Sequence, residues 1–135
     1  MLSKRILLAF DGTDEARRAL TYASELAGAL KAEIGVVSVV PIHAGRIGMD
    51  PWDDRTIHSE ELMEARQTLI EAGLTPTLYE PAGVIADEIV RTAQEAKYDH
   101  IVLGSRHAGI ATRVLEGSVS EAVAHRATIT VTIVH

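Results

Sequence analysis

Short runs of apolar residues alternate along this chain with segments in which apolar positions recur every three or four residues. The runs are too short for helices, and several are apolar throughout, as expected of strands buried on both faces of a parallel sheet. The recurring spacing is typical of helices that bury one face. The predicted strands span residues 6–10, 34–40, 75–79, 101–103 and 128–134.

Helices are predicted between these strands. The first begins at Asp14, and its apolar face continues to Leu30; the second begins near Ser59 and ends at Gly73. The third carries Ala86, Ile89, Val90 and Ala93, and the last carries Val119, Ala122 and Val123. Residues 41–58 contain two prolines and two glycines among scattered charges, which predicts a loop.

The resulting order, β-α-β-α-β-α-β-α-β, predicts an α/β fold with an open, doubly wound, five-stranded parallel sheet and helices on both faces. In such Rossmann-like sheets, ligands bind outside the carboxyl ends of the strands, where the strand order reverses. Asp11, Val39 and Gly104 each fall at the carboxyl end of a predicted strand. We therefore expect them to converge on one site.

Length and composition narrow the possible functions. A chain of 135 residues is expected to form one domain, residues 1–135. A net charge of −6 argues against nucleic-acid binding, which needs a basic face. The chain has no cysteine, which excludes disulfides and thiolate chemistry, and no apolar run approaches membrane-spanning length. We expect a soluble, cytoplasmic domain that binds neither nucleic acid nor membrane.

The segment from Gly104 to Ser120 is the strongest candidate for chemistry. It follows a predicted strand, contains glycines, and leads into a helix that starts near Gly117-Ser118. Backbone N–H groups of such a loop and of a helix start can bind an anion, and the hydroxyls of Ser118 and Ser120 lie within reach. Arg106, His107 and Arg113 add donors. The alternative is a plain connection in which Ser118 only caps the helix.

Two other classes of α/β protein fit less well. A dinucleotide-binding oxidoreductase would place its glycine motif after the first strand, where this chain has acids at positions 11, 14 and 15. A phosphoacceptor signalling domain would need an aspartate at the end of the third strand, where this chain reads Tyr79-Glu80-Pro81. No side chains suggest an activated nucleophile, so an enzymatic role is not expected, although slow ATP hydrolysis stays open.

At these residues the chain resembles the universal stress protein family over essentially its whole length. Residues 6–13 are similar to that family's first strand and turn, and residues 128–134 to its last strand. Gly104 and Gly117-Ser118 stand at the separation of the outer members of its Gly-x2-Gly-x9-Gly-Ser/Thr motif. Residues 115–120 are similar to its Leu-Leu-Gly-Ser-Val-Ser segment.

The resemblance implies the fold of adenine nucleotide alpha-hydrolase-like proteins and a stress-response regulator that binds ATP, with ADP or AMP as variants and with or without magnesium. Asp11 and the main chain of Val39 would contact the adenosine part. Gly104, Gly117, Ser118, Val119 and Ser120 would hold the phosphates. The site assigned by position consists of Ala9, Asp11, Val39, Leu103, Gly104, Arg106, His107, Gly109, Gly117, Ser118, Val119 and Ser120.

The chain departs from the family pattern at two positions in this segment. His107 stands where the motif has its second glycine, with Gly109 two residues later, and Glu116 stands where relatives have an apolar residue. The imidazole could obstruct a phosphate or donate to it. The alternative function is therefore a dimeric interaction module of the same family that does not bind nucleotide.

Two further expectations concern the 41–58 loop and the last strand. His43, Asp50, Asp53, Asp54 and His58 lack metal-ligand spacing, so we expect a solvated segment and no metal there. Residues 128–134 alternate hydroxyl and branched apolar side chains without proline or lysine. The strand order that the resemblance implies places this strand at a sheet edge, where unpaired N–H and C=O groups invite pairing, which predicts a homodimer through residues 128–134.

Overall fold

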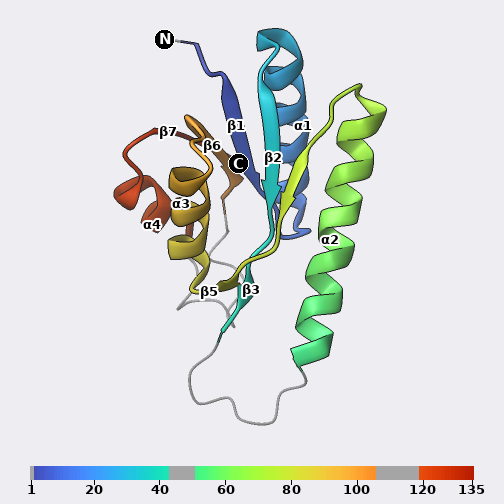
Figure 1. Ribbon diagram of the computed structural model, residues 1–135, viewed down its shortest axis with the longest axis vertical. Helices are drawn as coiled ribbons and strands as arrows, with labels where there is room; N and C mark the ends of the chain where they lie inside the picture. The colour runs from blue at the N-terminus through green and yellow to red at the C-terminus, as the bar shows by residue number, and fades with distance from the viewer. Residues whose placement is uncertain (1, 43–50, 106–118) are drawn as a thin grey trace.

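The computed structural model describes residues 2–42, 51–105 and 119–135, and for residues 51–55 it describes the helix alone. Five parallel strands form the main sheet, in the order β4-β2-β1-β6-β7 (Figure 1). Their bounds are β1 Arg5–Ala9, β2 Glu33–Val37, β4 Thr77–Tyr79, β6 His100–Gly104 and β7 Thr130–Val134. The strand order reverses at β1, which pairs with β2 on one side and β6 on the other. The predicted fold class and the edge position of the last strand are confirmed.

Four helices cover the two faces of the sheet among the described residues. α1 (Asp14–Leu30) and α2 (Pro51–Glu71) pack on one face, and α3 (Ile85–Glu95) and α4 (Val119–Arg126) on the other (Figure 1). Each face has its own apolar core. Because the strands are covered on both sides, Leu7 and Leu8 are both fully buried although they point to opposite faces.

The predictions of the second strand and of the loop after it are wrong in part. The strand ends at Val37, and Val40–Pro41 forms a separate strand, β3, which pairs with β5 (Ala82–Gly83) in a small second sheet. The chain is helical from Pro51, where a loop to residue 58 was predicted. A proline fits the first helical position because its fixed φ suits a helix and its missing N–H would have no partner there.

The buried His100 connects β6 to β7 and to the start of the chain. Its Nδ1 lies 2.8 Å from the Ser3 hydroxyl and its Nε2 lies 2.7 Å from the Thr132 hydroxyl. Burial lowers the pKa of His100, because an imidazolium loses hydration in the interior. The neutral histidine therefore joins β6, inside the sheet, to the edge strand β7 and to Ser3 by hydrogen bonds.

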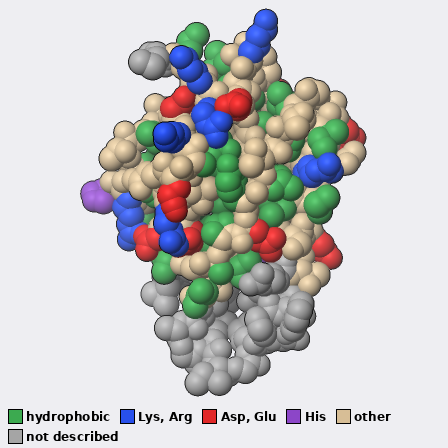
Figure 2. Space-filling view, in the orientation of Figure 1, with side chains coloured by type: hydrophobic (Ala, Val, Ile, Leu, Met, Phe, Trp, Pro, Cys, Tyr) green, Lys and Arg blue, Asp and Glu red, His purple; other side chains and the backbone are tan. Residues whose placement is uncertain are grey.

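The helices of the described residues and one face of their surface bear on membrane and nucleic-acid binding. None of the helices in these parts of the chain is long and apolar enough to cross a bilayer. Acidic and basic side chains are interspersed on the face drawn in Figure 2.

Gly35 on β2 allows Tyr98 to pack closely against this strand, on the face of the sheet that α3 covers. The hydroxyls of Tyr79 and Tyr98 lie 2.9 Å apart, and their rings meet edge to face at 5.9 Å. A Cβ at position 35 would lie 2.2 Å from the Tyr98 hydroxyl oxygen. By contrast, a Cβ at Gly28 on α1 would meet nothing within 4 Å.

We therefore expect Gly35→Ala to lower the free energy of unfolding by about 1–3 kcal/mol, because it overpacks the Tyr98 contact. Gly28→Ala is the matched control and should raise that free energy by about 0.5–1 kcal/mol, since alanine is the better helix former. Urea denaturation followed by circular dichroism measures both. Equal effects of the two substitutions would contradict the packing argument.

Candidate functional site

A cavity of ≈ 60 Å³ opens at the carboxyl ends of β1, β2 and β6. This is the point where the strand order reverses, and in open α/β sheets it is the usual ligand site. The starts of α3 and α4 close its sides, and α2 contributes one side chain. The described residues that line it are Ala9, Phe10, Asp11, Ala16, Val37, Ser38, Val39, His58, Ile85, Ile89, Leu103, Gly104 and Val119.

Half of the predicted site residues lie at this cavity. The structure brings together, as lining residues, Ala9, Asp11, Val39, Leu103, Gly104 and Val119. Ser120 follows directly on α4 and is buried. The remaining predicted positions, Arg106, His107, Gly109, Gly117 and Ser118, lie outside the described residues.

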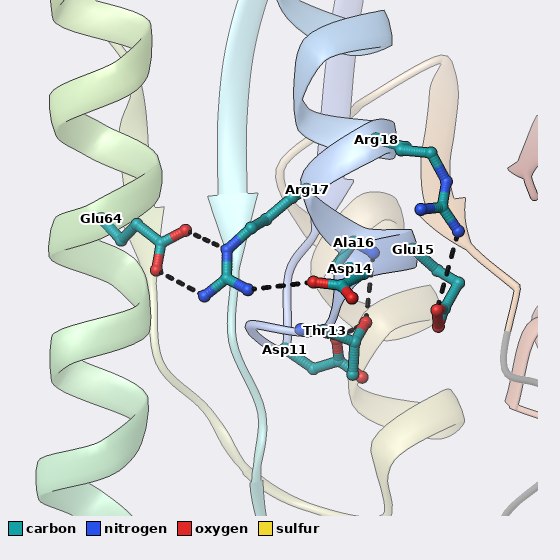
Figure 3. A network of polar contacts seen from close by, with 8 residues as sticks. All are labelled: Asp11, Thr13, Asp14, Glu15, Ala16, Arg17, Arg18 and Glu64. Atoms are coloured by element: carbon teal, nitrogen blue, oxygen red, sulfur yellow. Dashed lines mark hydrogen bonds and ion pairs between the residues drawn. The ribbon is translucent and has the colours of Figure 1, made fainter.

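Asp11 shapes the turn between β1 and α1. Its Oδ1 accepts hydrogen bonds from the Thr13 backbone N–H at 3.1 Å and from the Thr13 hydroxyl at 2.6 Å (Figure 3). Thr13 in turn caps α1, since its hydroxyl oxygen accepts from the Ala16 N–H at 3.1 Å. The carboxylate that lines the cavity is therefore held in place by the start of α1.

Gly104 has a packing role that the sequence did not reveal. A Cβ at this position would lie 2.6 Å from the carbonyl carbon of Glu15 and 2.7 Å from the Ala16 nitrogen. Backbone atoms of a helix cannot move aside cheaply, so only glycine lets the first turn of α1 rest on the end of β6. The close approach of α1 is by itself enough to require the glycine.

Arg17 connects α1 to α2. Its guanidinium donates to both carboxylate oxygens of Glu64, at 2.7 and 3.0 Å (Figure 3). These hydrogen bonds lower the pKa of Glu64, because they favour the ionised carboxylate. The two-bond geometry restricts the orientation of α2 relative to α1. This contact matters for the site because α2 also carries His58.

A polar cluster at the cavity was missed by the sequence reasoning. His58 Nδ1 lies 3.0 Å from the Ser38 hydroxyl and 2.9 Å from Glu61 Oε2, and the Ser38 hydroxyl donates to the same oxygen at 3.1 Å. The His58 side chain is only 16% exposed, so its assignment to a solvated loop is wrong. The signal available in the sequence was the three-residue spacing of His58 and Glu61, which puts both on one helix face.

The chemistry of this arrangement suits binding rather than a hydrolytic triad. In a triad the histidine uses one nitrogen for the nucleophile and the other for the carboxylate, whereas Ser38 and Glu61 both meet Nδ1. Within the described part of the chain, no group of three or more acidic or histidine side chains is placed to hold a metal ion.

A family model and a curated relative both match this chain, and both belong to the same family. The family model described as the universal stress protein family matches residues 3–135. A universal stress protein of Methanocaldococcus jannaschii is 31% identical over 130 residues, which cover 90% of this chain and 76% of the relative.

Two solved structures extend the comparison. A universal stress protein in complex with cAMP has a TM-score of 0.77 and 27% identity, covering 100% of this chain and 99% of that one. A universal stress protein from Archaeoglobus fulgidus in complex with dAMP has a TM-score of 0.74 and 25% identity, covering all of both chains.

The cap that holds the Asp11 turn can be tested by substitution. We expect Thr13→Ala to lower the free energy of unfolding by about 1 kcal/mol, because the Ala16 N–H loses its acceptor. Thr13→Ser keeps the hydroxyl and is the control, with a much smaller loss. Urea denaturation of the three proteins gives the comparison, and equal stability of the alanine and serine variants would refute the role of the cap.

Proposed function

The chain belongs to the universal stress protein family, and from this premise we propose that it is a stress-response regulator that binds an adenine nucleotide in the cavity at β1, β2 and β6. ATP is the proposed ligand, with ADP or AMP as alternatives. The observation that carries the proposal is the position of the cavity at the strand-order reversal, beside the start of α4. Relatives of the same fold hold cAMP and dAMP, which are adenine nucleotides.

The charges of the described residues favour one orientation of the nucleotide. The first turn of α1 carries Asp14 and Glu15, and Asp11 stands just before it. These carboxylates disfavour a phosphate at α1. The phosphates are therefore assigned to the start of α4, with Val119 and Ser120, where a helix N-terminus offers backbone N–H groups. Asp11 and the main chain of Val39 are left for the adenosine part.

The alternative function, a dimeric interaction module without nucleotide, shares the proposed assembly. β7 is an edge strand, and Thr130 at its start is exposed. One side of such a strand presents N–H and C=O groups that a second strand can pair with. We propose a homodimer through residues 128–134, in which two copies of β7 pair about a two-fold axis.

Calorimetric titration of ATP into protein freed of co-purified nucleotide tests the binding proposal. We expect binding by the wild-type chain and a loss of at least about tenfold in Gly117→Val, because the side chain displaces phosphate from its backbone donors. Gly28→Ala, in the second half of α1, is the control and should keep wild-type affinity. No heat of binding at millimolar ATP would leave the interaction module as the function.

The assembly is tested by two equivalent substitutions at the two sheet edges. Thr130→Pro changes the first residue of β7, and Thr77→Pro changes the first residue of β4, the other edge strand. Proline is tolerated at a strand start but removes an N–H. We expect a dimer for the wild type and for Thr77→Pro and a monomer for Thr130→Pro, by sedimentation equilibrium at micromolar concentration. A monomeric wild type rules the dimer out.

A further inference from the structure

The edge of the main sheet opposite β7 is a continuous row of backbone groups that runs from β4 into β5. β4 is the outermost strand beyond β2 (Figure 1, yellow-green). The ladder continues past the end of β4, because N–H groups of the segment after β2 donate to carbonyls of the edge. These bonds join Ser38 to Tyr79 at 3.0 Å, Val40 to Pro81 at 2.8 Å and Ile42 to Gly83 at 3.2 Å. The edge therefore spans residues 77–83 and is longer than the three residues of β4.

Every second residue of this edge turns its backbone groups away from the sheet. In an extended strand the N–H and C=O of one residue point to the same side, and those of the next residue point to the opposite side. The carbonyls of Tyr79, Pro81 and Gly83 point inward, so the groups of Leu78, Glu80 and Ala82 point outward. Within the described part of the chain, no hydrogen bond pairs these outward groups. Pro81 does not protect the edge, because the N–H that it lacks would have pointed inward.

A groove of ≈ 460 Å³ lies beside this edge, on the face of the sheet that α3 covers. The edge contributes Tyr79 and Pro81 to its lining. The helix contributes one face, made up of Glu88, Arg91, Thr92 and Glu95. The side chains of an extended segment paired with β4 would alternate between the two faces of the sheet. Every second side chain of such a segment would therefore point to the groove.

Glu95 gives the lining of the groove its net negative charge. Arg91 forms an ion pair with Glu88, so these two charges compensate each other. Arg5, near the end of the groove, is paired with Glu33 in the same way. Glu95 forms no ion pair among the described residues. A lysine or arginine side chain in the groove complements this charge, whereas an acidic side chain is repelled.

We propose that residues 77–83 and the groove beside them bind an extended segment of a partner protein, which adds a strand to β4 and places a basic side chain against Glu95. The outward backbone groups supply affinity, and the groove selects the side chain. No described residue lines both this groove and the cavity proposed for the nucleotide, so the inference does not rest on that ligand. β7 is the opposite edge, so the partner binds without displacing the proposed dimer.

Two capped, fluorescently labelled peptides test the selection of charge by anisotropy titration. One is Thr-Val-Lys-Val-Lys-Val-Thr, and the other has glutamate in place of both lysines. Their β-branched residues favour an extended backbone. We expect the wild-type protein to bind the basic peptide at least about tenfold more tightly than the acidic one. No binding of the basic peptide at millimolar protein, or equal affinity for both peptides, overturns the inference.

Two substitutions of Glu80 separate strand addition from attraction by charge. Glu80→Pro removes an outward N–H, while Glu80→Ala keeps it and is the matched control. Both variants lose the same carboxylate and its hydrogen bonds from Ser59. We expect the proline variant to bind the basic peptide about tenfold more weakly than the alanine variant. Circular dichroism melting checks that both are folded, and equal affinities of the two folded proteins overturn the addition of a strand.

A second pair of substitutions tests the groove without changing the backbone of the edge. Glu95→Gln removes the uncompensated charge, and Glu25→Gln on the exposed face of α1 changes the net charge equally. We expect Glu95→Gln to weaken binding of the basic peptide by about threefold, with the control close to wild type. Equal losses in both variants show only a general attraction to an acidic protein and overturn the role of the groove.

Sedimentation equilibrium identifies the other occupant that this edge admits, a second copy of the chain. We expect Glu80→Pro to keep the oligomeric state of the wild type, since the partner strand comes from another protein. A dimeric wild type together with a monomeric Glu80→Pro shows that a second copy covers β4, and overturns the inference.

Discussion

The close packing of α1 on the sheet is the contact on which the other features depend. The helix presents a face of small residues, with Ala16, Ala19, Ala23 and Ala27 almost fully buried. Its first turn rests directly on Gly104, so that β6 and the turn after β1 come together at one point. Larger side chains at these positions would lift the helix off the sheet. The carboxyl ends of β1 and β6 would then no longer border a common cavity with α1.

The position of α1 also controls what α2 brings to the site. Arg17 on α1 holds Glu64 on α2 through two hydrogen bonds, and Glu61 lies against Gly12 in the turn before α1. Together these contacts place His58 against Ser38 at the end of β2. The part of the cavity at the end of β2 is thus built by a chain of contacts from β6 through α1 and α2 to β2, in which each helix positions the next element.

The elements that border the cavity differ in charge. Carboxylates gather at the start of α1 and near His58, whereas α4 offers backbone N–H groups at its start. A nucleotide has the complementary division into an anionic part and a polar, uncharged base. The proposed orientation follows from this division, and it assigns phosphate binding and base recognition to elements that are distant in the sequence.

The sequence by itself determined the fold class and the convergence of Asp11, Val39 and Gly104, because parallel strands buried on both faces leave continuous apolar runs and have their carboxyl ends at one edge of the sheet. The edge position of β7 came from the resemblance to the family. It did not reveal the helical start at Pro51, since a proline among charges is equally typical of a loop and of a first helical turn. Only the tertiary structure decided the roles of Gly104 and His58. The first depends on how closely α1 approaches β6, and the second on which strand end α2 meets. Both are distances between segments far apart in the chain, which local patterns do not encode.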